Sequence, residues 1–181
     1  RIVMFITPHT IQQEGAELMK VMNGERTIGR YLLSGLLVVV SLITLCAMTN
    51  GIVSESLLHD ESLFARNIAV FPDALFYTGA PSPILYYTAN YVLVRILGDA
   101  EWVFRLIPLI GAVAGYLALV LFIKNKFDLL TAFICSLFLS ASYPLIHYAG
   151  NAHPYATDFL FSVLLLSATV AVLENPGNKR W

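Results

Sequence analysis

The feature that most constrains this chain is a set of four long apolar stretches whose interiors carry no charge. They cover residues 31–48, 106–123, 129–146 and 155–173, and Asp158, near one end of the last, is their single charged residue. Each has about 18–19 residues, close to the roughly 20 that a helix needs to cross about 30 Å of hydrocarbon. One Lys, Arg or Asp at midspan would cost about 2.5–3.5 kcal/mol on insertion. The pattern predicts an all-α integral membrane protein with about four transmembrane helices.

The composition agrees with a membrane protein and excludes one class of partner. Charged residues make up 13% of the chain, hydrophobic residues 57%, and the mean hydropathy is +0.71. A soluble domain would carry about 25% charged residues. The net charge of −1 and the lack of a basic tract exclude nucleic acid as a partner.

The basic residues predict the orientation of the chain in the membrane. With four spans, Arg66, Arg95 and Arg105 fall on one side, and the other eight basic residues fall on the opposite side. These eight are Arg1, Lys20, Arg26, Arg30, Lys124, Lys126, Lys179 and Arg180. The positive-inside rule then predicts a multi-pass protein with a cytoplasmic N-terminus. We expect it in an inner or plasma membrane, or in the ER membrane of a eukaryote.

Residues 1–30 are predicted to form a cytoplasmic N-terminal segment, and residues 31–181 a transmembrane region that begins a longer protein. Within the first segment, residues 10–23 predict a short amphipathic helix ending at Asn23-Gly24. The first outer loop is long and is expected to contain interfacial helices. One of these covers residues 83–97, which span only about 22 Å as a helix, so we expect it to lie in the interface rather than cross the membrane.

The outer side of this topology gathers the unusual polar residues. Asp60 and Glu61 lie in the first outer loop with Arg66, and Arg105 opens the second span. The short second loop contains His147, His153 and Tyr155, with Asp158 one turn later. The histidines lack the close spacing of a dependable metal motif, so neither a metal site nor another cofactor is predicted.

Simpler roles remain open for three of these residues. Asp60-Glu61 is also typical of a solvated loop pair, or of acidic residues that favour the dipole of a helix over 62–70. Arg105 also fits an interfacial anchor whose charge reaches the membrane surface. Asp158 also fits a cap of the last span.

Four short motifs occur in order along the chain. They are HDESLFARNIA around Asp60-Glu61, APSPILYY at residues 80–87, EWVFRLIPLIGA at 101–112 and YPLIHYAGNAHPYATDF at 143–159. Together they resemble the GT-C superfamily of membrane glycosyltransferases, and most closely the family-39-like group of protein O-mannosyltransferases and lipid A aminoarabinose transferases. The resemblance covers residues 31–173. His153 stands where that family commonly carries arginine, and the family's members have more spans than this chain.

The resemblance implies transfer of a sugar from a polyprenyl-phosphate donor to an unidentified acceptor at the extracytoplasmic face, within membrane lipid. It implies that Asp60 takes the acceptor's proton with Glu61 in support, and that the anomeric carbon is inverted. Arg105, then Arg66, are the expected ligands of the donor phosphate. His153, Tyr155 and Asp158 are expected in the substrate pocket.

Two other functions compete with the transferase. A transporter would place ionisable residues or broken helices near the membrane midplane, whereas these spans have only glycines as soft points. Of these, Gly111 and Gly115 form a G-x-x-x-G that predicts close helix packing. A non-catalytic membrane subunit that retains the fold is the second alternative.

Overall fold

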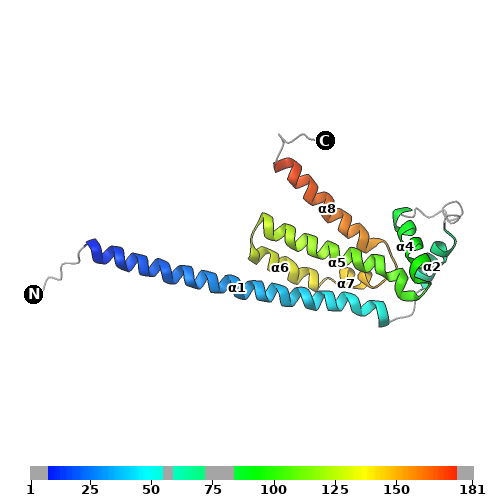
Figure 1. Cartoon of the computed structure of the whole chain (residues 1–181), viewed down its shortest axis with the longest axis horizontal. Coiled ribbons are helices and arrows are strands. Elements are labelled where there is room, and N and C mark those ends of the chain that lie inside the picture. The colour runs from blue at the N-terminus through cyan, green and yellow to red at the C-terminus, as the bar shows by residue number, and fades with distance from the viewer. Residues whose placement is uncertain (1–7, 55–58, 72–83, 175–181) are drawn as a thin grey trace, which may run out of the picture.

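The computed structural model describes the backbone of residues 8–54, 59–71 and 84–174, and side chains from residue 27 onward except residues 51, 53, 54, 59 and 60. Every regular element in these ranges is a helix. In chain order they are α1 (Pro8–Ser54), α2 (His59–Ala69), α4 (Ile84–Leu97), α5 (Glu101–Lys126), α6 (Leu129–Ser140), α7 (Tyr143–Ala149) and α8 (Tyr155–Glu174). Figure 1 shows α1, α5 and α6 side by side, with α2 and α4 beyond the start of α5.

Three of these helices are long and apolar enough to cross a membrane. They are Thr27–Asn50 within α1, the whole of α5 and the whole of α8. A fourth span is present if α6 and α7 count as one broken crossing. The prediction of an all-α membrane protein is confirmed for the described residues.

The third predicted span, 129–146, is wrong as a single helix. Its helix ends at Ser140, and α7 starts at Tyr143 with a bend of 66° between the two. Ser142 has extended backbone angles, and Pro144 occupies the first turn of α7. Proline has no backbone N–H to donate within a helix. It is therefore favourable in the first turn of a helix and unfavourable in the middle of a continuous one.

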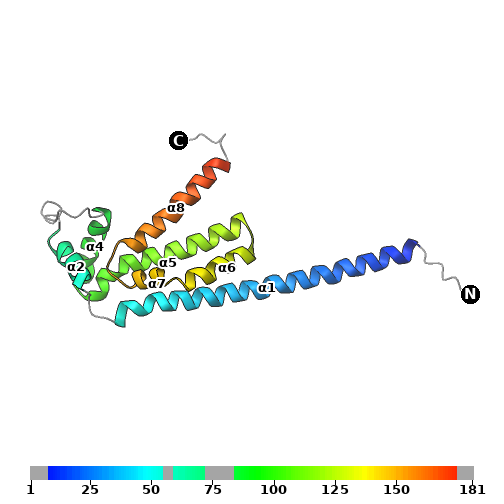
Figure 2. The ribbon, with the colours of Figure 1, turned by 180° about the vertical axis from the view of Figure 1, so that it is seen from behind.

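The short helix predicted over residues 10–23 is also wrong in extent. Residues 8–54 form one continuous helix that runs through Asn23-Gly24 without a cap. A single glycine inside a helix costs only about 1 kcal/mol, which the flanking turns offset. Figures 1 and 2 show that the N-terminal part of α1 projects far beyond α5 and α6.

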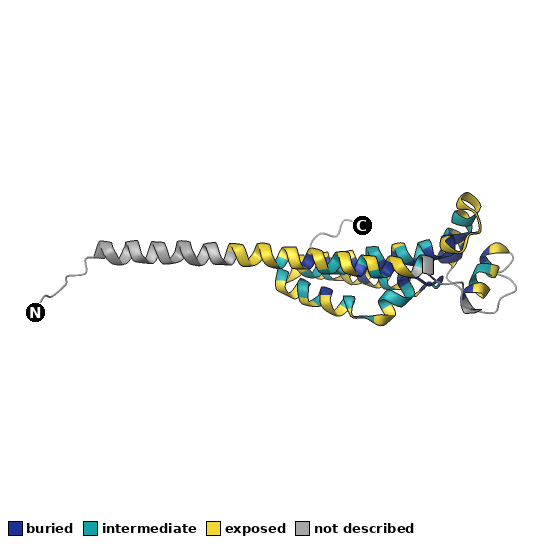
Figure 3. Ribbon diagram, turned by 90° about the horizontal axis from the view of Figure 1, so that it is seen from below, coloured by how far each residue is buried: buried dark blue, intermediate teal, exposed yellow. Residues whose placement is uncertain are grey.

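Helix α5 forms the centre of the bundle and packs against α1, α6, α7 and α8. The main core consists of Leu37, Met48, Ala112, Tyr116, Val120, Ala149 and Ala156. Figure 3 shows that buried residues concentrate where α1 meets the other helices, while the part of α1 beyond them is exposed or not described. The remaining faces carry exposed aliphatic side chains, as expected for helices that contact lipid.

The packing between α5 and α8 depends on two glycines. A Cβ on Gly111 would lie 2.9 Å from Cα of Thr157, and one on Gly115 would lie 2.7 Å from the Phe159 ring. Any larger residue would push the helices apart. The close packing predicted from the G-x-x-x-G pair is confirmed.

Hydroxyl groups link three helices inside the bundle. The Tyr116 hydroxyl lies 3.0 Å from Oγ of Ser41 and 2.5 Å from Oγ of Ser136. Thr44 and Ser140 bond to each other across α1 and α6 at 2.5 Å. Such interhelical hydrogen bonds stabilise helix association where water is absent.

The two ends of the bundle differ in character. The α2–α4 end holds α2, α4, the start of α5 and the loop 150–154, with a second apolar cluster that includes Ile68, Tyr87 and Phe104. The opposite end, which we call the basic end, carries Arg30, Lys124 and Lys126. There Lys126 forms an ion pair with Glu174, which joins the ends of α5 and α8.

Candidate functional site

A buried ion pair between Glu61 and Arg105 forms the centre of the α2–α4 end. Nη2 of Arg105 donates to Oε2 of Glu61 at 3.0 Å, and Nε donates to Oε1 at 3.3 Å. The side chain of Arg105 is 1% exposed and that of Glu61 is fully buried. This two-point geometry matches the planar guanidinium to the carboxylate and gives a strong, directional contact.

The sequence of α2 accounts for the inward position of Glu61. Glu61 shares one helical stripe with Phe64, Ala65 and Ile68, at spacings of three, four and seven residues. Ile68 is fully buried on that stripe, while Leu63 and Arg66 are exposed on other faces. The carboxylate is therefore carried inside by its apolar neighbours, and it requires a charged partner there.

Backbone groups from two further segments complete the arrangement. The N–H of Ala152 donates to Oε1 of Glu61 at 2.6 Å, and Nη1 of Arg105 donates to the carbonyl of Ile52 at 3.3 Å. Glu61 and Arg105 thus connect α2 and α5 to the end of α1 and to the loop between α7 and α8. Four segments distant in sequence are fixed at one point.

Asp60 directly precedes Glu61 as the second residue of α2. Its side chain, like that of His59, lies outside the described residues. The backbone that carries it is adjacent to Glu61, whose carboxylate accepts hydrogen bonds from Arg105 and Ala152.

The rings of His153 and Tyr155, two residues predicted for the substrate pocket, are in contact. Their rings stack with centroids 5.6 Å apart and an interplanar angle of 24°. His153 also meets the Phe64 ring edge to face at 4.8 Å, which brings the loop 150–154 onto α2. Tyr155 is 54% exposed, so one side of this aromatic pair remains accessible.

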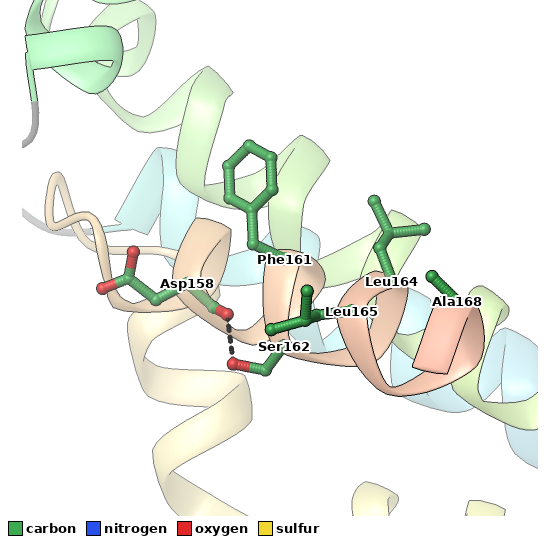
Figure 4. Close-up of a pocket in the computed structure, with 6 residues that line it drawn as sticks. All are labelled: Asp158, Phe161, Ser162, Leu164, Leu165 and Ala168. Atoms are coloured by element: carbon green, nitrogen blue, oxygen red, sulfur yellow. Dashed lines mark hydrogen bonds between the residues drawn. The ribbon is translucent and has the colours of Figure 1, made fainter. Parts of the chain in front are cut away.

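Asp158 follows Tyr155 by one turn of α8 but borders a different hollow. It lines a shallow groove of about 570 Å³ along α8, together with Phe161, Ser162 and Leu165. Figure 4 shows Asp158 at one end of this groove and Ala168 at the other. Tyr155 instead lines a separate cavity of about 250 Å³ beside Tyr148 and Phe159. Asp158 and Tyr155, which were expected in one substrate pocket, therefore border two different hollows, and His153 lines neither of these two.

Arg66, the second candidate for the donor phosphate, is exposed in the last turn of α2. Arg105, the first candidate, is buried and engaged with Glu61 and Ile52. Of the two arginines, only Arg66 presents its charge at the surface.

Sequence reasoning missed the buried side of α4. Tyr86, Tyr87 and Asn90 are buried against α2 and α5, whereas the expectation for residues 83–97 was only that this helix lies in the membrane interface. Burial raises the pKa of Tyr86, and the nearby Tyr87 and Glu61 add to the effect while Asn90 opposes it. The signal was present in the spacing: positions 86, 87 and 90 form one stripe of the helix, and a polar Asn on that stripe is typical of a protein-facing side.

Among the described residues no group of three or more His, Cys, Asp or Glu side chains is arranged to hold a metal ion. Comparison with known proteins adds no assignment: no protein-family model, no curated protein and no solved structure matches the chain.

Proposed function

We propose that the chain is the membrane-embedded part of a glycosyltransferase that moves a sugar from a polyprenyl-phosphate donor to an acceptor at the extracytoplasmic face. The single observation that carries this proposal is the buried Glu61–Arg105 pair with its Ala152 contact. It fixes the start of α2, and with it the Asp60 backbone, at the end of the bundle. A reaction on a lipid-borne sugar needs a carboxylate held at that level.

The two adjacent carboxylates have different roles in this proposal. Glu61 is a positioning residue, because both of its oxygens already accept hydrogen bonds from Arg105 and Ala152. Asp60 is the general base. The acceptor oxygen attacks the anomeric carbon, its proton passes to Asp60, and the bond from that carbon to the phosphate oxygen breaks. The polyprenyl phosphate leaves with the bonding electrons, and the configuration of the carbon inverts.

The departing phosphate gains negative charge at its ester oxygen and requires a cation. Arg66 is the better candidate of the two arginines, because it is exposed on α2, the helix that also carries Asp60 in its first turn. Arg105 would first have to leave Glu61, which would strand a buried carboxylate at a cost of several kcal/mol. Arg105 therefore acts through Glu61, and the donor phosphate binds Arg66.

The aromatic pair of His153 and Tyr155 forms the wall of the sugar site, since it is packed on α2 through Phe64 and is open on one side. Asp158 faces the groove on α8 and contacts the acceptor rather than the donor sugar.

The direct test is release of free polyprenyl phosphate from polyprenyl-phosphate-linked sugars in membranes that contain the chain, measured by mass spectrometry. Loss of a general base lowers a rate about 10²–10⁴-fold. We expect Asp60→Asn to reduce release by that factor while membrane insertion is unchanged.

Asp99→Asn is the matched control, because Asp99 is an exposed carboxylate at the same end of the bundle. It is expected to leave the rate within twofold of the unmodified chain. Turnover by Asp60→Asn close to that of Asp99→Asn would refute the assignment of the base.

A further inference from the structure

A groove of about 650 Å³ opens at the basic end, between α1 and the turn that joins α5 to α6. Helix α1 contributes Gly29, Arg30 and Leu33, and the turn contributes Phe127 and Asp128. Its volume lies in the range of about 300–1,000 Å³ that is typical of small-ligand sites. It lies at the opposite end of the bundle from the Glu61–Arg105 site.

The position of this groove along the helices places it at the level of lipid head groups. Gly29 and Arg30 belong to the first turn of the apolar segment Thr27–Asn50, and Phe127 follows the last residue of α5. The ends of apolar spans mark the boundary between hydrocarbon and the polar interface. A ligand in this groove would meet water on one side and acyl chains on the other.

Two opposite charges line the groove without neutralising each other. Arg30 comes from α1 and Asp128 from the turn, and within the described part of the chain they form no ion pair. Oδ1 of Asp128 accepts the N–H of Thr131 at 2.6 Å, which caps α6 and fixes the carboxylate in place. The groove therefore presents a cation and an immobilised anion with space between them.

Apolar side chains flank this charged pair. Phe127 is 67% exposed and Leu130 is 55% exposed, and both border the groove with Leu33. Such exposed apolar side chains beside the ends of the spans are expected to contact the upper part of lipid chains.

We propose that this groove binds the head group of phosphatidylethanolamine, with the lipid phosphate on Arg30 and its primary ammonium on Asp128. The charge order of the head group matches that of the groove. A phosphatidylglycerol head group would satisfy Arg30 but would bring an anion towards Asp128. A phosphatidylcholine head group has the same charges, but its quaternary ammonium has no N–H to donate to a carboxylate.

The test is native mass spectrometry of the full chain in detergent, titrated with each of these three lipids. Phosphatidylethanolamine should be retained about tenfold more tightly than either of the others, as expected for one extra hydrogen bond between charged groups. Arg30→Gln and Asp128→Asn should each remove about that factor. Asparagine is as good a helix cap as aspartate, so Asp128→Asn removes the charge and keeps the start of α6.

Two glycines on α1 provide a matched pair for steric blocking. A Cβ added at either Gly29 or Gly35 would meet no atom within 4 Å, so both positions accept a larger residue. Gly29 borders the groove and Gly35 does not. We expect Gly29→Leu to lower retention of phosphatidylethanolamine about tenfold and Gly35→Leu to leave it unchanged.

Equal retention of the three lipids by the unmodified chain would overturn the proposal, and so would strongest retention of phosphatidylglycerol. Equal effects of Gly29→Leu and Gly35→Leu would also overturn it. None of these results depends on glycosyl transfer, so the two proposals succeed or fail separately.

Discussion

Glu61 and Arg105 determine the chemistry of the α2–α4 end because neither charge has access to water. An isolated buried charge is far more costly than a buried pair, since only the partner compensates for the lost hydration. The pair also holds the Ala152 N–H and the Ile52 carbonyl. The contribution of the pair to stability is therefore measured by removing one partner, and the number of its hydrogen bonds does not give it.

Glu61→Gln should destabilise the chain by about 3–5 kcal/mol, because it leaves the Arg105 charge buried without a counter-ion. The measurement is reversible unfolding in detergent, followed by loss of helical circular dichroism. Arg66→Gln is the control: Arg66 is exposed on the same helix, so its loss should change the stability by less than about 0.5 kcal/mol.

Replacing both partners gives a stricter test of the same idea. Glu61→Leu combined with Arg105→Met removes both buried charges at similar volume, and such replacements are often neutral or stabilising. We expect the double variant to be more stable than Glu61→Gln alone. If it were equally unstable, the backbone contacts of Glu61 rather than its charge would be what stabilises this end of the bundle.

The sequence predicted that Glu61 and Arg105 lie at the same end of the bundle, but not that they touch. The membrane topology assigns a side to every loop residue, and that assignment is a consequence of span count alone. Which residues pair across 44 positions depends on the packing of α2 against α5, which hydropathy does not encode. The inward stripe of Glu61, Phe64 and Ile68 was the available clue.

Among the helices, the lengths of the long apolar ones could be predicted from the sequence, but the position of the break between α6 and α7 could not. The apolar windows located α5 and α8 correctly, because charge-free runs of that length are rare outside membranes. The same windows gave no signal of the bend between α6 and α7, since Ala141 and Ser142 are as compatible with a span as their neighbours. Pro144 was the only residue that marked the break, through its missing N–H.

Gly111→Ala should destabilise the contact of α5 with α8 by about 1–3 kcal/mol, the usual cost of overpacking. Its new Cβ would lie 2.9 Å from Cα and 3.0 Å from N of Thr157, backbone atoms that cannot rotate away. Gly115→Ala should cost less, because its nearest atom belongs to the Phe159 ring. Gly35→Ala, which meets nothing within 4 Å, is the control for helix propensity, and an equal loss of stability in all three would contradict this account.

The cap of α6 predicts a pH effect. The Thr131 N–H that donates to Asp128 lowers the pKa of this carboxyl from its usual 3.8. The folded state therefore binds the proton less readily than the unfolded state, so the capping contribution is complete above pH 3.8 and is lost as the pH falls further. The difference in stability between the unmodified chain and Asp128→Ala should shrink over that acid range. The stability of both proteins is measured by chemical unfolding at each pH. If their difference in stability stays constant down to about pH 2, the cap is not the cause of that difference.

At the scale of the whole molecule, the sequence predicted a helical membrane protein and the grouping of its basic residues. Lys126 at the end of α5 forms an ion pair with Glu174 at the end of α8, and Arg30 borders a groove with the α5–α6 turn. Lys126 and Arg30 therefore lie at the same end of the bundle. The mutual positions of α2, α4 and the loop 150–154 could not be predicted, because their burial depends on tertiary contacts between short helices. The continuous α1 was missed for a related reason: a locally plausible stop at Asn23-Gly24 is overridden by the helix on both sides.

Whether α4 crosses the membrane decides which loops share a side, and the positive-inside rule then predicts which side is cytoplasmic. With 14 residues, α4 is about 21 Å long, too short for about 30 Å of hydrocarbon. Its Tyr86, Tyr87 and Asn90 are buried against protein, and we therefore expect α4 to lie on the bundle rather than to cross the bilayer. With α4 outside the membrane, the positive-inside rule predicts Asp99 on the extracytoplasmic side and Lys124 on the cytoplasmic side.

Cysteine labelling can test this orientation directly. Cys46 and Cys135 are free and are first replaced by Ser. A membrane-impermeant maleimide added to intact cells should then label Asp99→Cys at once, and Lys124→Cys only after permeabilisation. Both positions are exposed, so accessibility within the protein does not limit the reaction. The reverse pattern would mean that the α2–α4 end of the bundle faces the cytosol. Because Glu61 and Arg105 are paired at that end, both would then lie on the cytosolic leaflet, away from an extracytoplasmic sugar donor.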